Sequence, residues 1–87
     1  MTILYVNQAG NTEPCDMEET CVRMLSTSNE KMRMLENMDG RLQIHNRYVH
    51  FTTTLGTMST KAEYASYDLH TGIITIQTLR SEYIFKV

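Results

Sequence analysis

Residues 44–51 read IHNRYVHF, and the apolar side chains around this stretch decide how the second half of the chain folds. Leu42 and Ile44 have one parity along the chain, whereas Val49 and Phe51 have the other. Because successive side chains of a strand point to opposite faces, one straight strand would divide these four residues between two faces. The chain must therefore change its register between Ile44 and Val49.

A two-residue turn at positions 46–47 supplies that change. It places Ile44 opposite Val49 and, two residues farther out, Leu42 opposite Phe51, so that all four share one face. Asparagine tolerates the left-handed backbone of such a turn, but arginine suits it less well than glycine, so a bulged continuous strand is the alternative. In both interpretations the His-Asn-Arg sequence is a backbone device rather than a catalytic cluster.

The segment around Asp68 predicts another hairpin. Asp68 ends one strand pattern and Gly72 precedes the next, which favours a four-residue loop with a left-handed glycine. This loop pairs Tyr67 with Ile74. The loop backbone can then donate hydrogen bonds to the aspartate.

The last strand is expected to return after a tight turn at positions 80–81, which would pair Ile76 with Phe85. The final third of the chain is then a three-strand antiparallel meander. Residues 55–60, LGTMST, are expected to form the loop that joins this meander to the preceding hairpin.

The first half of the chain predicts a short strand followed by a segment whose apolar residues have helical spacing. Residues 2–7, TILYVN, predict a strand, after which Thr12 and Pro14 suit the start of a helix over about 13–26. The apolar positions of this segment recur at the spacing of one helical face: Met17, Cys21, Met24 and Leu25.

A second helical segment is expected from a capping box at Thr27 and Glu30 to Asp39-Gly40, with Ser26 and Ser28 as rival caps. The two segments could equally be one kinked helix. Methionine supplies five of the apolar positions between residues 17 and 38, which indicates a loosely specified core or an adaptable binding surface.

These patterns predict an α+β fold with one domain over residues 1–87. It is a two-layer sandwich, in which an antiparallel sheet of about five or six short strands with a C-terminal meander carries one kinked or two short helices on one face, in the order β-α(-α)-β-β-β-β-β. No apolar run is long enough to cross a bilayer, the first residues lack a secretory signal, and two cysteines are few for a small secreted fold. The expected location is the cytoplasm, without membrane contact.

Charge is distributed unevenly along the chain. Residues 1–40 hold seven acids against three bases, whereas residues 41–87 hold five bases against three acids. The acids near the expected start of the first helix either complement its dipole or form a contact patch for a basic partner. They are Glu13, Asp16, Glu18 and Glu19.

The sequence contains no recognisable motif for catalysis, a metal or a cofactor. The chain has five histidines and cysteines that could ligate a metal: Cys15, Cys21, His45, His50 and His70. They include no C-x-x-C or H-x-x-x-H pair. The four glycines are isolated, so no phosphate-binding loop is indicated. We therefore predict no catalytic residue, no metal and no cofactor.

A partner surface is predicted on the outer side of the sheet, where the pairing gathers apolar residues among polar ones. The residues expected to contact a partner are Tyr64, Ile73, Gln77, Leu79, Ile84, Lys86, Arg47, Tyr48 and His50. A homodimer through this face or through an edge strand is a further expectation.

Two functions fit these features. The first is a small non-catalytic protein-interaction module, an inhibitor or adaptor that covers a functional surface of a larger protein or complex, such as a phage-type antagonist of a host enzyme or defence system. The second is a nucleic-acid-binding or mRNA-cleaving domain that uses the basic sheet face. Its contacts would be Arg41, Arg47, His50, Arg80 and Tyr83.

At the level of topology, the expected order of a strand, two helices and a sheet resembles that of small bacterial toxins that cut mRNA on the ribosome. Those proteins are typically strongly basic, whereas this chain has a net charge of −2. A protein partner therefore ranks ahead of nucleic acid.

Overall fold

The computed structural model describes residues 5–6, 17–68 and 70–87, and most of them belong to one antiparallel sheet. Eight strands follow the order β1-β6-β7-β8-β2-β3-β4-β5. Their bounds are β1 Tyr5–Val6, β2 Met17–Thr27, β3 Asp39–His45, β4 Tyr48–Thr53, β5 Gly56–Lys61, β6 Tyr64–Asp68, β7 Ile73–Gln77 and β8 Glu82–Lys86. A 3-10 helix, η1, spans Glu30–Leu35. The predicted α+β sandwich is therefore wrong, because no long helix packs on the sheet in the described part of the chain.

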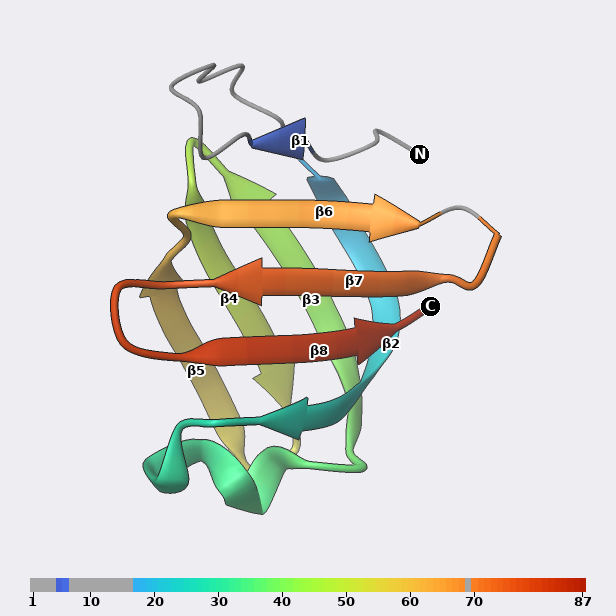
Figure 1. Cartoon of the computed structure of the whole chain (residues 1–87). Coiled ribbons are helices and arrows are strands. Elements are labelled where there is room, and N and C mark those ends of the chain that lie inside the picture. The colour runs from blue at the N-terminus through green and yellow to red at the C-terminus, as the bar shows by residue number, and fades with distance from the viewer. Residues whose placement is uncertain (1–4, 7–16, 69) are drawn as a thin grey trace.

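The sheet folds over on itself into two layers whose strands cross (Figure 1). Strands β6, β7 and β8 form one layer, and β3, β4 and β5 form the other. The long strand β2 belongs to both layers, since its first part pairs with β3 and its last part pairs with β8. The core lies between the layers, where the rings of Phe51 and Phe85 are 5.0 Å apart at their centroids and tilted by 60°.

Strand β2 occupies most of the segment that the sequence predicted as a helix over 13–26; residues 13–16 lie outside the described residues. Its register with β3 shifts between Met17 and Thr20, and its register with β8 shifts between Met24 and Ser26. Each bulge adds one residue and exchanges the faces of the side chains that follow. The buried positions are Met17, Val22, Met24 and Thr27, an irregular spacing that the apolar pattern of the sequence concealed.

Only the short helix η1 remains of the second predicted helix. Its N-cap is Asn29, whose side chain accepts a hydrogen bond from the Lys31 backbone, so neither Thr27 nor a neighbouring serine caps it. The buried Leu35 anchors the turn to the core. The predicted helix end at Asp39-Gly40 is also wrong, because these residues begin β3.

The hairpin between β3 and β4 confirms the turn predicted at positions 46–47. Asn46 and Arg47 both have positive φ angles, of 50° and 72°. Ile44 pairs with Val49 and Leu42 pairs with Phe51, so the four apolar side chains all enter the core.

Residues 56–61 form strand β5, where the sequence predicted a loop. A two-residue turn after Thr53 returns the chain, and Met58 then stands opposite Phe51 in the core. The pattern was missed because Met58 is the only large apolar residue of the strand. Its neighbours are glycine, threonine, serine and lysine.

In the layer formed by β6, β7 and β8, the predicted pairing of Tyr67 with Ile74 is confirmed. The left-handed conformation predicted for Gly72 is also confirmed, with a φ of 73°. The register of β8 is displaced by two residues from the predicted one, because Ile76 pairs with Tyr83 instead of Phe85. A four-residue loop over 78–81 takes the place of the tight turn. A displacement of two residues keeps every side chain on its predicted face, so the inner face was still correct.

The first predicted strand appears as β1, which is described over Tyr5–Val6 and pairs with β6. The other residues of that prediction lie outside the described residues. No helix in the described part of the chain is long and apolar enough to cross a membrane.

Candidate functional site

The exposed side of β6, β7 and β8 forms a face with two isoleucines, here called the isoleucine face. Cross-strand pairing arranges it in three rows: Tyr64, Gln77 and Glu82; Ser66, Thr75 and Ile84; Asp68, Ile73 and Lys86. Ile73 and Ile84 are diagonal neighbours on adjacent strands, a relation that brings apolar side chains within reach of each other. Both are half-buried, as is Tyr64.

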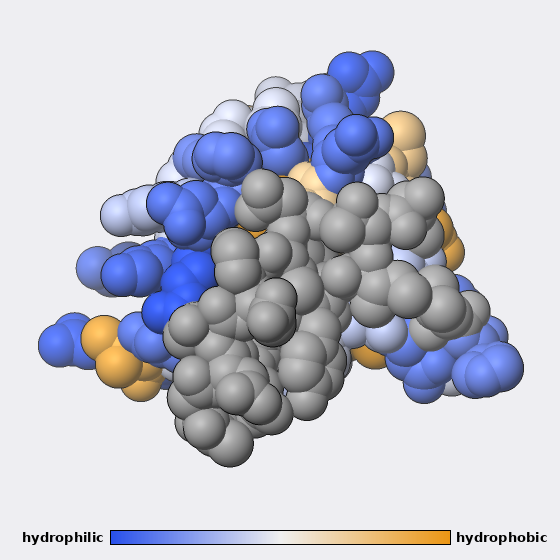
Figure 2. All heavy atoms as spheres, turned by 90° about the horizontal axis from the view of Figure 1, so that it is seen from above, coloured by the Kyte–Doolittle hydropathy of each residue, from blue (hydrophilic) through white to orange (hydrophobic). Residues whose placement is uncertain are grey.

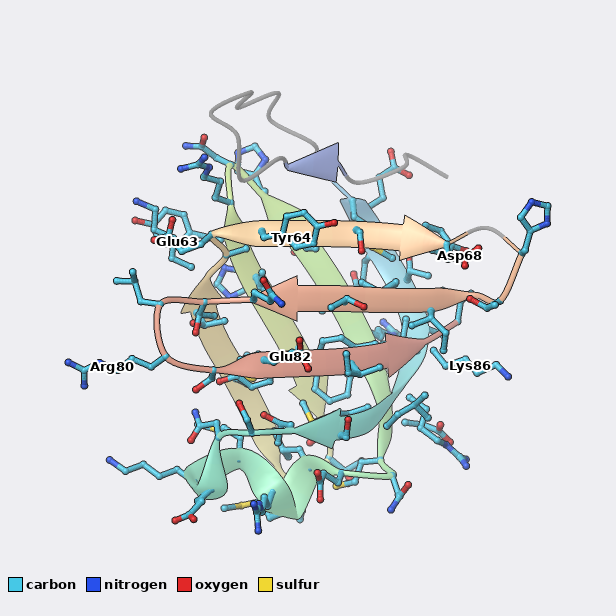
Figure 3. All side chains as sticks on the ribbon, in the orientation of Figure 1. Glu63, Tyr64, Asp68, Arg80, Glu82 and Lys86 are labelled. Carbon is cyan, nitrogen blue, oxygen red and sulfur yellow. The ribbon has the colours of Figure 1, made fainter. Side chains whose placement is uncertain are left out.

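The structure thus brings together five of the predicted partner residues: Tyr64, Ile73, Gln77, Ile84 and Lys86. Charged side chains border them, and Arg80 and Lys86 reach outward at opposite ends of β8 (Figure 3). Leu79, also predicted, projects from the 78–81 loop and is 85% exposed. It lies beside the isoleucine face and not on it.

The other three predicted partner residues, Arg47, Tyr48 and His50, belong to the layer formed by β3, β4 and β5. The exposed side of β3, β4 and β5, here called the basic face, again has three rows: Arg41, Thr52 and Thr57; Gln43, His50 and Ser59; His45, Tyr48 and Lys61. His50 Nδ1 lies 2.8 Å from Ser59 Oγ. Tyr48 is 52% exposed, so its ring is accessible.

Two further contacts expected for nucleic acid are not on the basic face. Arg80 lies in the loop between β7 and β8. Tyr83 is buried, and its hydroxyl accepts a hydrogen bond of 2.9 Å from Asn29 Nδ2. Tyr83 is therefore a core residue and cannot stack on a base.

The predicted acidic patch is described only in part. Glu18 and Glu19 are exposed on β2, whereas Glu13 and Asp16 lie outside the described residues. Glu19 Oε1 is 3.3 Å from Arg41 Nη1, across the pair β2–β3. Since β2 is a strand, these carboxylates do not complement a helix dipole.

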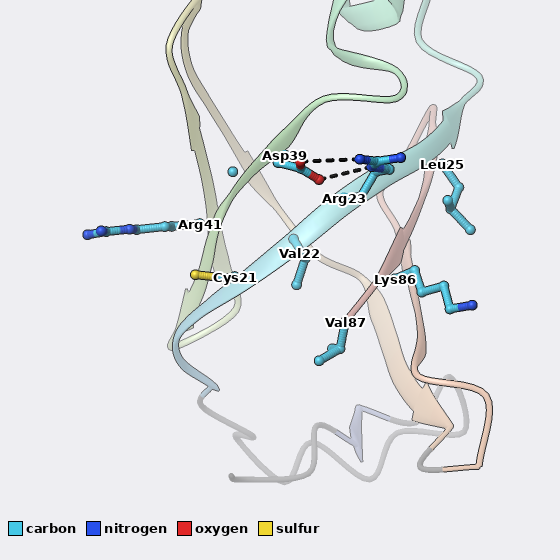
Figure 4. A pocket seen from close by; sticks show the side chains of 9 residues that line it. Cys21, Val22, Arg23, Leu25, Asp39, Arg41, Lys86 and Val87 are labelled. Carbon is cyan, nitrogen blue, oxygen red and sulfur yellow. Dashed lines mark hydrogen bonds and ion pairs between the residues drawn. The ribbon is translucent and has the colours of Figure 1, made fainter.

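A shallow groove of about 650 Å³ lies where β2 passes from one layer to the other (Figure 4). Its apolar residues are Val22, Leu25 and Val87, and its charged residues are Arg23, Asp39, Arg41 and Lys86. Arg23 donates to both carboxylate oxygens of Asp39, at 2.9 and 3.2 Å. These hydrogen bonds, together with the charge of Arg23, lower the pKa of Asp39.

The ion pair between Arg23 and Asp39 was missed because the sequence placed Arg23 on a helix. With β2 as a strand, the two residues are direct cross-strand partners. The exposed thiol of Cys21 borders the same groove. The other cysteine of the chain, Cys15, lies outside the described residues.

Asp68 has a structural role in the loop between β6 and β7. The backbone N–H of His70 donates to its carboxylate at 2.9 Å, and that of Thr71 does so at 3.4 Å. The first of these hydrogen bonds is the main cause of the lowered pKa of Asp68. A carboxylate held in this way fixes a turn.

Among the described residues, no three His, Cys, Asp or Glu side chains converge on a possible metal position. Viewed from above, the described surface is mainly hydrophilic, and the visible apolar residues form small separate groups (Figure 2). No protein-family model, curated protein or solved structure matches the chain.

Proposed function

We propose that this chain is a non-catalytic protein-interaction module, an inhibitor or adaptor that covers a functional surface of a larger protein through its isoleucine face. The observation that carries the proposal is the arrangement of Ile73, Ile84 and Tyr64 on adjoining strands of one exposed face. Apolar side chains that cluster on a surface, with polar residues around them, are typical of protein-binding sites.

The charges around this face suit recognition of one partner. Asp68 and Glu82 stand at opposite corners of the face, and Lys86 stands beside Ile73. Charges at the rim of an interface set its orientation and exclude wrong partners, while the apolar centre supplies most of the affinity. A phage-type antagonist of a host enzyme or defence system would work by such coverage alone.

The test is a binding assay that compares Ile84→Asp with a matched control, Thr52→Asp. Both changes introduce one carboxylate on an outward-facing strand position, the first on the isoleucine face, where Ile84 is half-buried, and the second on the basic face, where Thr52 is exposed. We expect the tagged wild type and Thr52→Asp to capture the same protein from a lysate at high salt, and Ile84→Asp to lose it. Equal capture by both variants, with both folded by circular dichroism, would refute the isoleucine face as the interface.

A second candidate function is binding of single-stranded nucleic acid by the basic face. Arg41, His45, Tyr48, His50 and Lys61 lie on this face, and its three rows contain no carboxylate. Accessible tyrosine and cationic side chains on a sheet are a frequent platform for stacked bases and phosphates. This observation favours nucleic acid on that face only.

Fluorescence anisotropy with labelled single-stranded oligonucleotides tests this candidate. Phosphate contacts predict an affinity that decreases steeply with salt, and Tyr48→Ala should weaken binding if the ring stacks on a base. Absence of binding at low salt would eliminate the nucleic-acid function and leave the protein-interaction proposal intact. Ile84→Asp serves as the control that should not change oligonucleotide binding.

A further inference from the structure

Within the described part of the chain, strand β5 ends the order of the sheet and pairs on one side only, with β4. The Ala62 backbone N–H donates to the Arg47 carbonyl at 2.8 Å, and the closing pair of the hairpin is Thr53 with Gly56. Hydrogen-bonded pairs alternate along an antiparallel ladder, so the even-numbered residues of β5 bond to β4. The backbone groups of Thr57, Ser59 and Lys61 therefore point away from it.

These outward groups form an open edge. Among the described residues, none exchanges a backbone hydrogen bond with Thr57, Ser59 or Lys61, and all three residues are exposed. The strand contains no proline, and within it the described structure has no bulge. A straight edge with unpaired amides is a template for another strand.

We propose that two copies of the chain pair through their β5 strands, antiparallel, about a two-fold axis at Ser59. Five antiparallel registers could use the outward groups, with the axis at any position from 57 to 61. An axis at position 58 or 60 would pair only two of the three outward residues with each other. An axis at Lys61 would set two lysines of like charge opposite each other, and an axis at Thr57 would run Ser59 against the hairpin turn. The axis at Ser59 pairs all three outward residues, with each Thr57 opposite Lys61 of the second copy.

The surroundings of the edge suit the same occupant. A hollow of about 380 Å³ borders the end of β5, and its lining includes Thr60, Lys61 and the highly exposed Leu79. A strand added to the edge would lie next to this hollow. This pairing is independent of the proposed function, because the isoleucine face belongs to the other layer and stays free in both copies.

Sedimentation equilibrium over a range of protein concentrations tests the pairing. We expect wild type to show a monomer–dimer equilibrium. Ser59→Pro removes one outward N–H from each copy and should weaken the dimer roughly ten- to a hundredfold, since a proline at an edge position costs the monomer little. Ser59→Ala, which loses the same contact to His50 but keeps the N–H, should dimerise as wild type does.

A second pair of variants tests the register and does not depend on the folding of the proline variant. Thr57→Glu would place a carboxylate opposite each Lys61 and should tighten the dimer roughly three- to tenfold. Thr57→Lys would place like charges there and should weaken the dimer by a similar factor. A wild-type chain that stays monomeric at every concentration, or a dimer that responds equally to both Thr57 variants, would overturn the proposal.

Discussion

The two layers of the molecule have the same design on the inside and different chemistry on the outside. Each is a three-strand antiparallel meander, and each buries a row of apolar residues against the other. On the outside, one layer carries isoleucines among charges of both signs, and the other carries arginine, histidine, tyrosine and lysine. The inner faces therefore account for the fold, whereas function has to be sought in the difference between the outer faces.

The hairpins of the two layers also differ. In the β3–β4 hairpin, the two-residue turn forces a non-glycine pair, Asn46 and Arg47, into the left-handed region. In the β6–β7 hairpin, a glycine takes that conformation at Gly72 and Asp68 accepts backbone hydrogen bonds. The first solution stores strain in the turn, and the second relieves it with glycine and a carboxylate.

The largest effect is expected where the layers meet. Phe51 comes from one layer and Phe85 from the other, both are fully buried, and their rings are in contact. Replacing either by alanine should cost roughly 3–5 kcal/mol of unfolding free energy, because a cavity forms in the centre of the core. Urea unfolding followed by circular dichroism measures this loss. If one variant were nearly as stable as wild type, the two layers would not contribute equally to the core.

A smaller change in unfolding free energy, of opposite sign in the two layers, is expected at two residues with left-handed backbone, Gly72 and Arg47. Gly72→Ala should destabilise the chain by about 1–2 kcal/mol, because a Cβ is disfavoured at a φ of 73°. Arg47→Gly should stabilise it by roughly 0.5–1 kcal/mol, because glycine adopts the φ of 72° without strain. Thermal unfolding of both variants measures the sign of each stability change. A loss of stability in Arg47→Gly would show that its side chain contributes more than its backbone strain costs.

The sequence predicted the hairpins well because their information is local. Parity of apolar residues on the two sides of Asn46-Arg47 leaves one register, and the side chain of Asp68 with Gly72 specifies the next loop. The face of β8 was also predicted although its register was not. A two-residue error preserves parity, and Thr78 stabilises a four-residue loop through its hydroxyl, which the apolar pattern does not reveal.

The sequence misled in β2 for a physical reason. Two bulges change the parity twice within one strand, so the buried residues Met17, Val22 and Met24 show no regular alternation. Met17, Cys21, Met24 and Leu25 instead imitate a helical face, although Cys21 and Leu25 are exposed. Because bulges are fixed by pairing with both β3 and β8, this strand could not be recognised before its neighbours were placed. Because β2 was predicted as a helix, neither the groove nor the ion pair between Arg23 and Asp39 could be predicted.

For the candidate site, the sequence identified the outer-face residues of β6, β7 and β8 but merged two surfaces into one. Tyr48 and Ile84 were assigned to a single partner face, yet they lie on different layers. A linear pattern gives the face of each strand within its sheet. The folding of that sheet over β2 is a long-range event that no local pattern encodes.

The loop between β7 and β8 differs from the other two hairpin connections because a side-chain hydroxyl holds it. The Thr78 hydroxyl accepts hydrogen bonds from the Ser81 backbone at 3.0 Å and from the Arg80 backbone at 3.4 Å. Thr78→Ala should therefore cost about 1 kcal/mol. Thr78→Ser keeps the hydroxyl and should retain most of this stability in the same unfolding assay. If both variants lost the same amount, the methyl group and not the hydroxyl would be responsible.

The smallest effect is a pH dependence that distinguishes the β6–β7 loop from the β3–β4 turn, which has no carboxylate. The hydrogen bonds from His70 and Thr71 hold the pKa of Asp68 below its usual value. A lowered folded-state pKa contributes stability that is present above the unfolded carboxyl pKa of about 3.9 and is lost as the pH falls through the folded-state value. Asp68→Asn should thus be less stable than wild type at about pH 7, and the difference should shrink at an acidic pH, as the carboxylate of wild type becomes protonated. Melting temperatures of the two proteins at both pH values measure this, and a constant difference would mean that the geometry of the side chain, and not its charge, stabilises the loop.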